Sequence, residues 1–469
     1  MLTKHSRIWA GILALTLMLG ICLVRPSDNI RAAGPDKIGI YTNSFGYYVL
    51  VTDPVQGRIL KYSNDGLYLG VVVPSVSTHV TGEKWTLKKP VDIVTCRLTD
   101  VLGVADPETG HSYIYELDGH THHRNGNPGT GPGKTEEMWG VAMTEIDEVK
   151  SQALLDRKGC KVNHWAPPPG GVKDPRDGVW LRDFGSKGTG DGQLMFPEAM
   201  VYRVHDKKHE LYIADTGNNR IVVFSLTGQF VKNIGSAGAG NGQFKDPIDV
   251  DFDFHDAQGD KMWVLERGNK RTSVFDRAGK FVRSISLGSL TRPSSQTIDV
   301  DGNLWVTDPE QNRAYKFDQN GRQLLTINNL INPPNTSRKI VRVYIGKFIM
   351  TINDVAKAID APPYIDKGRT MVPLRAISEG LGAKVEWNDK ERKVTITLGT
   401  KKVEVWIDNP TGRIDGKPYP MPDGVAPTIR RGRTFVPVRF VAEGLGAHVS
   451  WNPKDLKFAS GAVTVIYPK

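Results

Sequence analysis

The chain has 469 residues, of which 39% are hydrophobic and 8% aromatic, so it can bury sizeable cores and is not a wholly disordered protein. Its length predicts two or three domains of roughly 100 to 200 residues each. Three cysteines exclude a disulfide scaffold. The formal net charge of +10 at pH 7 indicates attraction to anionic partners.

Residues 1–33 have the pattern of a secretory signal peptide. A basic stretch with Lys4 and Arg7 precedes seventeen apolar residues at 8–24, and a polar stretch ends in RAAG. We expect cleavage within RAAG, with an uncleaved N-terminal anchor as the alternative, since seventeen residues are at the short edge of a membrane span. The protein is therefore expected to be secreted or associated with the cell envelope. There a basic surface favours anionic wall polymers or lipid headgroups over nucleic acid.

A six-fold repeat of roughly 40 to 60 residues follows the signal. Each copy has an acid, a base or histidine five residues later, and an aromatic residue nine residues after the acid. The acids with their partners are Asp53 and Arg58, Asp106 and His111, Asp156 and Lys161, Asp215 and Arg220, Glu266 and Arg271, and Asp308 and Arg313. The aromatic residues are Tyr62, Tyr115, Trp165, Phe224, Phe275 and Phe317.

Each copy has the residue pattern of a four-stranded meander. Apolar runs such as LYIA and MWVL, which suit a pleated strand, precede the acid. Tight turns such as TGNN and PEQN follow it, and a second turn such as SNDG or DRAG leads to an outer strand. Four strands in each of six copies predict a closed ring of six blades.

Copies four and five resemble NHL repeats. They read GTGDGQLMFPEAMV…LYIADTGNNRIVVFSLTGQFVKNIG and GAGNGQFKDPIDV…MWVLERGNKRTSVFDRAGKFVRSI. The resemblance covers about residues 38–330 and is weakest in copies two and three. It implies a six-bladed β-propeller, which we assign to residues 34–330.

The acids and bases are predicted to form a rim on one face of the propeller. The turn between the second and third strands lies on that face, as does the loop between blades. In one interpretation each acid caps its turn and pairs with a base of its own or the next blade. In the other, the rim binds a polar ligand. We favour the structural interpretation, because a repeat can satisfy its own charges and exposed pairs add only ~0.2–1 kcal/mol each.

Two segments, 119–134 and 166–193, are predicted to be irregular loops on the same face. Long loops on a rigid scaffold commonly carry binding residues. We expect them to contact a sugar, a peptide or an anionic polymer, with a loop that binds nothing as the alternative. The candidate ligand-binding residues are Arg176, Trp180, Arg182 and Phe184.

A histidine cluster in the first of these loops is a candidate metal site. His120, His122 and His123 could hold zinc, copper or nickel, although such surface clusters more often bind metal adventitiously, so no cofactor is expected. Peptide-amidating lyases and gluconolactonase-like hydrolases, two related propeller families, place catalytic metals in the channel. His205 and His255 are predicted at the opposite face, which gives a channel metal little support.

Two cysteines remain after removal of the signal. Cys96 is predicted in an inner strand and Cys160 in a turn. A bond between them would need two adjacent blades to bring them within reach, so we favour two unpaired thiols.

A second duplication follows a linker at residues 331–340, which contains NPPNTS. GRTMVPLRAISEGLGAKVEW at 368–387 and GRTFVPVRFVAEGLGAHVSW at 432–451 lie 64 residues apart. In each copy a proline suits the first helical turn, apolar residues recur on one helix face, and a glycine suits the C-cap. Each copy therefore predicts a short helix packed on a small sheet, followed by a strand that carries tryptophan.

These copies resemble the copper amine oxidase N-terminal-like domain, or stalk domain, which is frequent in exported proteins of Gram-positive bacteria. The resemblance covers residues 341–469 and implies a small duplicated α+β domain. In the oxidases, catalysis belongs to a separate domain with an Asn-Tyr-Asp/Glu motif and a His-x-His copper site. This sequence has no Asn-Tyr pair, and its one His-x-His lies in the propeller region. Amine oxidase activity is therefore not implied.

Together these patterns predict a non-catalytic binding protein of the cell envelope, with a propeller that presents its binding face on a stalk-like domain. The sequence has no Gly-rich phosphate loop, no G-x-S-x-G elbow and no paired metal-carboxylate motif. The expected partner is a protein, a peptide or an anionic wall polysaccharide, and RRGR at 430–433 is the densest basic patch. The alternative is a metal-dependent lyase or lactone hydrolase with its site in the propeller channel.

Overall fold

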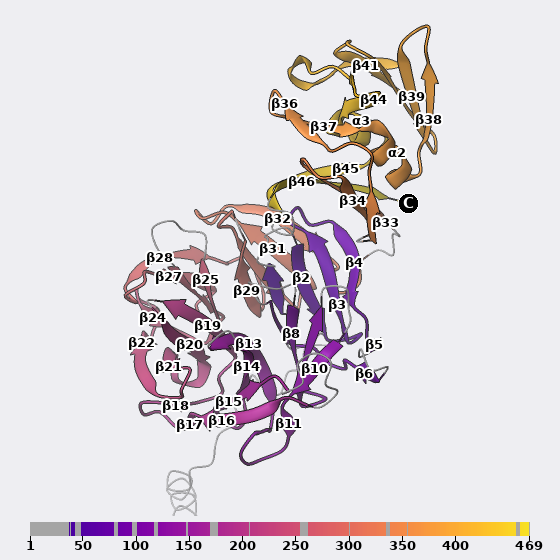
Figure 1. Ribbon diagram of the computed structural model, residues 1–469. Helices are drawn as coiled ribbons and strands as arrows, with labels where there is room; N and C mark the ends of the chain where they lie inside the picture. The colour runs from indigo at the N-terminus through magenta and orange to yellow at the C-terminus, as the bar shows by residue number, and fades with distance from the viewer. Residues whose placement is uncertain are drawn as a thin grey trace, which may run out of the picture.

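A computed structural model gives the arrangement of most of the chain (Figure 1). The described residues are 37, 39–42, 48–78, 83–95, 101–116, 121–146, 149–168, 177–205, 207–253, 261–299, 301–333, 338–353, 355–455 and 460–468. The predicted signal at 1–33 lies outside them. Within the described part, the helices are all too short or too polar to cross a bilayer.

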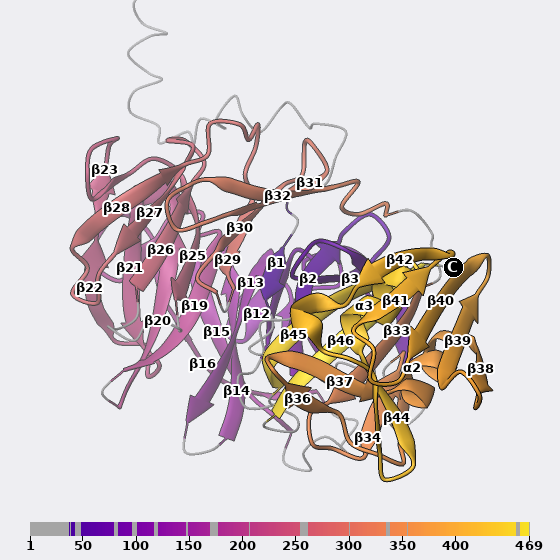
Figure 2. The same cartoon turned by 90° about the horizontal axis from the view of Figure 1, so that it is seen from above.

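Six four-stranded antiparallel sheets form a ring around a central axis, as predicted (Figures 1 and 2). Blade 1 consists of β1 (Ile40–Thr42), β2 (Tyr48–Asp53), β3 (Arg58–Ser63) and β4 (Tyr68–Val73). Blade 2 consists of β7 (Asp92–Thr95), β8 (Val101–Asp106), β9 (His111–Glu116) and β10 (Thr121–Asn125). Blade 3 consists of β13 (Met138–Ile146), β14 (Val149–Asp156), β15 (Lys161–Ala166) and β16 (Val179–Phe184). A hairpin of β5 (Val76–Thr78) and β6 (Lys84–Thr86) joins the first two blades.

Blades 4 to 6 repeat the same order from the innermost strand outward. Blade 4 consists of β19 (Ala199–His205), β20 (Lys208–Asp215), β21 (Arg220–Ser225) and β22 (Phe230–Ile234). Blade 5 consists of β25 (Pro247–Asp253), β26 (Lys261–Glu266), β27 (Arg271–Phe275) and β28 (Phe281–Ser286). Blade 6 consists of β29 (Ser295–Ile298), β30 (Leu304–Asp308), β31 (Arg313–Phe317) and β32 (Gln323–Asn328). In every blade the second strand ends at the acid of the repeat and the third begins at its basic or histidine partner.

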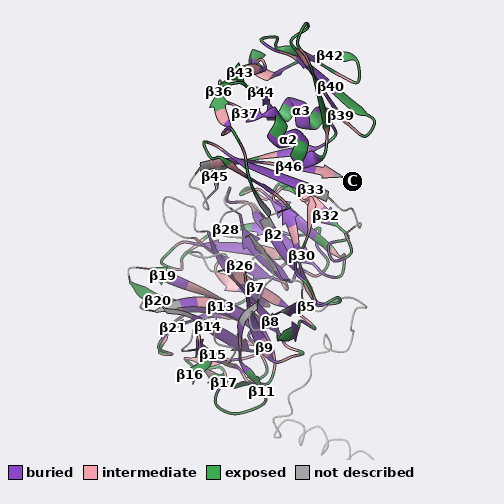
Figure 3. Ribbon diagram, turned by 45° about the vertical axis from the view of Figure 1, so that its right-hand side comes forward, coloured by how far each residue is buried: buried purple, intermediate pink, exposed green. Residues whose placement is uncertain are grey.

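Buried residues run through the blades (Figure 3), and hydrophobic clusters between adjacent blades hold the ring together. The six aromatic residues of the repeat are all buried there, which confirms their predicted role as blade cores. Phe224, for example, packs on Phe184 with ring centroids 5.3 Å apart, and Phe275 packs on Phe244 at the same distance. Aromatic pairs of this kind add to the free energy gained from burial alone.

The ring closes between blades 1 and 6 without exchange of strands. Blade 1 is built entirely from β1 to β4, so its junction with blade 6 relies on side-chain packing and loop contacts. Tyr62 and Trp305 share one buried cluster with Leu330 and Ile331. The Tyr62 hydroxyl also donates a hydrogen bond to the Leu330 carbonyl. The segment just after β32 therefore belongs to the propeller core.

The C-terminal domain contains three antiparallel sheets and two short helices. Their order is β35-β34-β33-β46-β45, β36-β37-β44-β43 and β38-β39-β40-β41-β42. The elements are β33 (Arg338–Tyr344), β34 (Ile349–Ile352), β35 (Val355–Ala358), β36 (Tyr364–Asp366), β37 (Arg369–Pro373), α2 (Leu374–Leu381), β38 (Lys384–Asn388), β39 (Lys393–Leu398), β40 (Lys401–Trp406), β41 (Thr411–Ile414), β42 (Lys417–Pro420), β43 (Thr428–Arg430), β44 (Arg433–Pro437), α3 (Val438–Gly444), β45 (His448–Asp455) and β46 (Ser460–Pro468).

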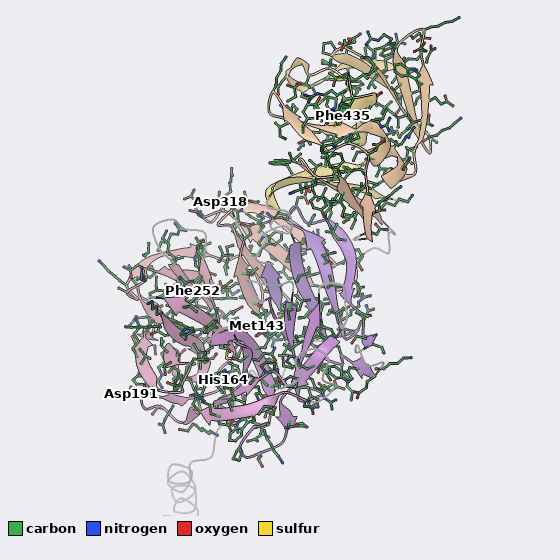
Figure 4. All side chains as sticks on the ribbon, viewed as in Figure 1. Met143, His164, Asp191, Phe252, Asp318 and Phe435 are labelled. Atoms are coloured by element: carbon green, nitrogen blue, oxygen red, sulfur yellow. The ribbon has the colours of Figure 1, made fainter. Side chains whose placement is uncertain are left out.

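The two copies of the duplication pair with each other through their central strands. Val372 of β37 lies opposite Val436 of β44, and both belong to the core beneath α2 and α3. Phe435 points to the other side of this sheet, into a smaller cluster (Figure 4). Each helix begins directly after its proline, Pro373 or Pro437, one residue later than expected. Strand β33 already begins within the predicted linker, so the connection is shorter than residues 331–340.

The C-terminal domain lies beside blade 1 (Figure 1). Strand β33 contacts β4, and His448 of β45 pairs with Asp65 in the turn after β3. The hydrogen bond that His448 donates to the Asp65 carboxylate raises the pKa of His448 above its usual range. This ion pair joins the two domains.

Candidate binding face of the propeller

The acids of the repeat are buried, so their carboxylates do not form an open charged ring. In blades 1, 4 and 5 each acid pairs with the base five residues later. The distances from arginine Nε to carboxylate oxygen are 2.8 Å for Arg58 and Asp53, 2.9 Å for Arg220 and Asp215, and 2.8 Å for Arg271 and Glu266. The structural interpretation of the rim agrees with these contacts.

In blades 2, 3 and 6 the residue five positions after the acid contacts a group other than that acid. His111 Nδ1 lies 2.7 Å from the carbonyl oxygen of Gly126, Lys161 pairs with Asp183 at 2.9 Å, and Arg313 donates to the Gln311 side chain. The acids Asp106, Asp156 and Asp308 instead accept several backbone N–H bonds, which tie the turn to the loop that precedes the blade.

Glycine-rich loops between blades 2 and 5 form a repeat of their own, which corrects the prediction of irregular loops at 119–134 and 166–193. Each loop closes with a short parallel bridge: β11 (Asn127–Pro128) with β12 (Lys134–Thr135), β17 (Ser186–Lys187) with β18 (Gln193–Leu194), and β23 (Ser236–Ala237) with β24 (Gln243–Phe244). Their carbonyls accept hydrogen bonds from Lys161, Arg220 and Arg271. The bases therefore hold these loops against the blades.

Trp180 also occupies a repeated position. Cross-strand pairing places it opposite Trp165, as Phe230 lies opposite Phe224 and Phe281 opposite Phe275. Its indole packs on Gly133, where a Cβ atom would approach Trp180 Cγ to 2.9 Å. Its Nε1 donates to Asp183 at 2.7 Å. Trp180 is nevertheless 40% exposed, so it covers a loop and retains an open face.

The remaining predicted ligand-binding residues are dispersed. Phe184 is buried in the core between blades 3 and 4, where it cannot contact a ligand at the surface. Arg182 is half-buried on β16, opposite His164, and Arg176 lies outside the described residues. The described members of this set, Trp180, Arg182 and Phe184, are therefore not brought together as one surface site.

The predicted histidine metal site is only partly described. His120 and the side chain of His122 lie outside the described residues, while His123 is buried. The side chain of His205 and all of His255 also lie outside them. Across the described ranges, we find no group of three or more His, Cys, Asp or Glu residues arranged to hold a metal ion.

Cys160 is buried and carries a free thiol, and Cys96 lies outside the described residues. Burial raises the pKa of the Cys160 thiol, so the neutral form is favoured. This environment is that of an inert structural cysteine.

Charged residues from several blades meet at the axis of the propeller, on the face of the glycine-rich loops. We call this set the channel mouth: Lys37, Asp92, Arg157, Glu198, Asp249 and Arg267. Lys37 precedes β1 and donates to the Glu198 backbone carbonyl at 3.0 Å. Arg267 Nη2 lies 3.2 Å from the Glu198 carboxylate. Asp92 and Asp249 accept N–H bonds from Val141 and Gln296 of the following blades.

Opposite charges stabilise some carboxylates at the channel mouth more than others. Burial alone would raise the pKa of Glu198, but the charges of Arg267, Arg157 and Lys37 outweigh it and hold this pKa below its usual range. Burial raises the pKa of Asp92 and raises that of Asp249 to about 6. Deeper in the same strand, burial raises the pKa of Asp251 to about 7.

Two N–H donors, one within the channel mouth and one beside it, have no acceptor among the described residues. Trp139, on the inner strand of blade 3, is 6% exposed, and its Nε1 makes no hydrogen bond. Arg157 stacks over this indole at 4.6 Å and has an unpaired Nε. A buried donor without a partner costs about 1–3 kcal/mol. A ligand that supplies an acceptor would remove this cost.

Sequence reasoning missed the channel mouth, although one of its signals is visible. The run DPIDVDFD places acids at alternate positions of an inner strand, among apolar residues. In a strand, alternate side chains share a face, so the pattern indicates a polar inner surface. Lys37, Glu198 and Arg267 carry no comparable local signal.

The raised pKa values of Asp249 and Asp251 predict a dependence of stability on pH. In the unfolded chain both groups titrate near ~3.9, so between about pH 4 and 7 the folded protein binds more protons. Stability is therefore expected to fall as pH rises through this range, by up to ~1.4 kcal/mol per pH unit for each group. Urea unfolding between pH 5 and 8 should show a smaller slope for Asp251→Asn. An unchanged slope would contradict the buried position of this carboxyl.

Two family models match adjacent parts of the chain. Residues 196–337 match a 6-bladed beta-propeller, and residues 339–459 match the copper amine oxidase N-terminal domain. The chain therefore carries a six-bladed β-propeller followed by a copper amine oxidase N-terminal-like domain.

Individual relatives are more distant. The chain is 26% identical over 174 residues to Protein brain tumor of Drosophila melanogaster, which is 37% of this chain and 16% of that protein. It thus spans about a sixth of that relative's length. Virginiamycin B lyase from Staphylococcus aureus matches 70% of this chain and 94% of its own at 12% identity, with a TM-score of 0.40. A chain of a nidogen/laminin complex matches 60% and 94% at 16% identity, with a TM-score of 0.40.

Proposed function

We propose that this protein is a non-catalytic binding protein, secreted or held at the cell envelope, whose propeller presents its binding face beside a stalk-like domain. The observation that carries the proposal is the channel mouth, where the six-fold repeat is broken. Most acids and bases of the rim are satisfied by their own blades. At the axis, Lys37 and Glu198 have no charged counterparts in the other blades, and a base directly follows the acid of the repeat only in blades 3 and 5, as Arg157 and Arg267.

The channel mouth favours a ligand with an acidic group. Arg157 Nε and Trp139 Nε1 have no acceptor within the part of the chain that the structure describes, and Arg267 is partly exposed beside them. A carboxylate would form charge-assisted hydrogen bonds with these donors, which are stronger than neutral ones. An acidic segment of a protein or peptide can supply such a carboxylate. It would bind at the mouth itself, because the buried carboxylates Asp92 and Asp249 would repel a second acidic group placed deeper in the channel.

The N-terminal sequence supports the proposed location. Residues 1–33 have the basic, apolar and polar regions of a secretory signal. The described cysteine is a free thiol rather than part of a disulfide framework, so the fold depends on its hydrophobic cores. An exported binding protein of this kind would meet wall polymers and other exported proteins.

A display library of twelve-residue peptides would test binding at the channel mouth. We expect peptides selected on the full chain to be enriched in Asp and Glu. Their affinity should fall about tenfold in Trp139→Phe, which removes the indole N–H and keeps an aromatic ring. Trp263→Phe is the matched control, since Trp263 is also buried, has an unpaired Nε1 and lies under an arginine, Arg283.

The control should leave affinity unchanged. Selected peptides without acidic residues, or an equal loss in both variants, would show that the channel mouth is not the binding site. A stoichiometric metal ion in the purified chain, found by mass spectrometry and required for turnover of a lactone or cyclic peptide, would replace the binding proposal by the enzymatic alternative.

A further inference from the structure

The positive charge of the chain is concentrated in its C-terminal domain. Residues 338–469 contain 23 of the 61 lysines and arginines and 13 of the 51 acids, a surplus of ten that equals the formal net charge of the whole chain. Residues 34–337 contain 34 basic and 37 acidic residues. The overall positive charge of the chain therefore comes from the C-terminal domain, while the propeller offers an acidic group only the local donors of its channel mouth.

A groove of about 320 Å³ crosses this domain where the two copies of the duplication meet. Ile365 and Arg369, from the hairpin of β36 and β37, form one side. Arg439 and Phe440, from the first turn of α3, form the other side, together with Trp451 of β45. Ile365 is 46% exposed and Trp451 is 43% exposed, so the groove presents apolar surface to solvent.

Trp451 packs against a neighbouring strand and is still 43% exposed. Its ring packs against the backbone at Gly461, where a Cβ atom would approach the ring to 2.3 Å. A side chain at Gly461 would therefore displace the indole. The face of an indole carries negative electrostatic potential, which attracts the polarised C–H groups of a sugar ring. An exposed indole in a groove can serve as a stacking platform for a sugar.

Two arginines flank this platform with unused hydrogen-bond donors. Arg369 is paired through Nε with Asp423, and Arg439 through Nη1 with Glu443 at 3.3 Å. Both arginine side chains are at least 41% exposed. Each has five N–H donors, and exposed ion pairs of this kind contribute ~0–1 kcal/mol. Both arginines can therefore turn donors toward a carboxylate or phosphate.

The same residue types recur one repeat earlier, with the two copies exchanged. Helix α2 contacts β44 and β38, as α3 contacts β37 and β45. Trp387 and Ile429 are 45% and 46% exposed, close to the values for Trp451 and Ile365. The corresponding residues are Trp387 for Trp451, Arg375 for Arg439, Arg433 for Arg369, and Ile429 for Ile365.

We propose that the C-terminal domain binds an anionic polysaccharide, with sugar rings stacked on Trp387 and Trp451 and acidic groups held by the neighbouring arginines. Two equivalent sets of residues favour a polymer over a single sugar, because one chain can engage both sets and gain effective concentration at the second. The proposal is independent of the ligand at the channel mouth. The surplus of positive charge favours an anionic polymer, and the exposed tryptophans favour a polymer built of sugar rings.

Binding of the full chain to immobilised alginate, a linear polymer of uronic acids, tests this inference. We expect retention on alginate and none on neutral dextran of similar length. Trp387→Ala/Trp451→Ala should weaken alginate binding at least tenfold, while each single variant loses less. Trp180→Ala is the control, since that tryptophan is equally exposed but lies on the propeller. Arg375→Gln/Arg439→Gln should also weaken binding without a change in the melting temperature.

Three results would overturn the proposal. Unchanged alginate binding in the double tryptophan variant would leave only non-specific charge attraction. Equal retention on dextran would remove the role of the arginines. Binding to phosphatidylglycerol vesicles without binding to alginate would identify a membrane surface as the partner. If the double alanine variant does not fold, Trp387→Phe/Trp451→Phe keeps the test valid. The smaller rings should weaken alginate binding less than alanine would, and the double variant should again lose more than either single variant.

Discussion

Replacing Asp215 by alanine is expected to lower the free energy of unfolding of the propeller by about 3–5 kcal/mol, which is the usual cost of removing one partner of a buried ion pair. Asp215 is fully buried. Its carboxylate accepts hydrogen bonds from Arg220 Nε, Asn218 Nδ2 and the backbone N–H of Met195. Alanine would leave all three donors without their acceptor and would release the loop before blade 4.

Urea unfolding of the full chain measures this effect. Asp318→Ala is the control, since Asp318 also accepts backbone N–H bonds in a turn but is 21% exposed. We expect that variant to lose no more than about 1 kcal/mol. Equal losses in the two variants would show that the acids of the repeat are ordinary turn residues rather than ties between a blade and its neighbouring loop.

Truncation of Trp305 to alanine is expected to destabilise the propeller by about 3–5 kcal/mol, as for other buried tryptophans. Trp305 is fully buried and fills the junction between blades 1 and 6. Among the described strands none crosses this junction, so a cavity there weakens the closure of the ring directly. We expect a lower melting temperature and faster hydrogen exchange in β2 and β3.

Trp180→Ala provides the comparison for Trp305→Ala. The indole of Trp180 is 40% exposed and packs against the loop at Gly133, so we expect the free energy of unfolding to fall by about 1 kcal/mol or less. If Trp305→Ala were as mild as Trp180→Ala, the ring would have to be closed by contacts other than the cluster around Tyr62 and Trp305.

The propeller could be predicted because its repeat is encoded at fixed spacing. An acid at the end of the second strand and a base at the start of the third define a turn of constant length, so six copies remain in register. The aromatic residue four positions after the base points into the core for the same reason. Burial of Tyr62 and Phe275, for example, follows directly from this alternation.

The glycine-rich loops could also have been found from the sequence. GTG stands 27 to 25 residues before Asp156 and again before Asp215, and GAG stands in a similar place before Glu266. Histidines and prolines around the loop before blade 3 obscure this pattern. The equivalence of Trp180 to Phe230 is obscured because strand β16 begins with three exposed apolar residues, Val179, Trp180 and Leu181.

The channel mouth could not be predicted, because its residues meet only when the ring closes. Lys37 precedes the first blade, Glu198 lies at the start of the fourth, and Arg267 lies in a turn of the fifth. Their separation in sequence exceeds 60 residues in each case, and no local pattern links them. Their proximity depends on the number of blades and on the direction of each inner strand.

The groove of the C-terminal domain could not be predicted for a similar reason. Its two sides come from different copies of the duplication, since Arg369 belongs to the first copy and Arg439 and Trp451 to the second. The sequence shows that both copies contain the same residue types. It does not show that the copies pair through β37 and β44 and thereby exchange their partners.

Hydrogen exchange of the full chain, with and without an acidic peptide selected on it, tests the proposed binding function most directly. We predict slower exchange in the bound state for the amides around Val141, Glu198 and Gln296, which surround the channel mouth. Exchange in β16, where the sequence placed the site, should not change. Protection of β16 around Trp180 without protection of the channel mouth would contradict the account and return the binding site to the outer edge of blade 3.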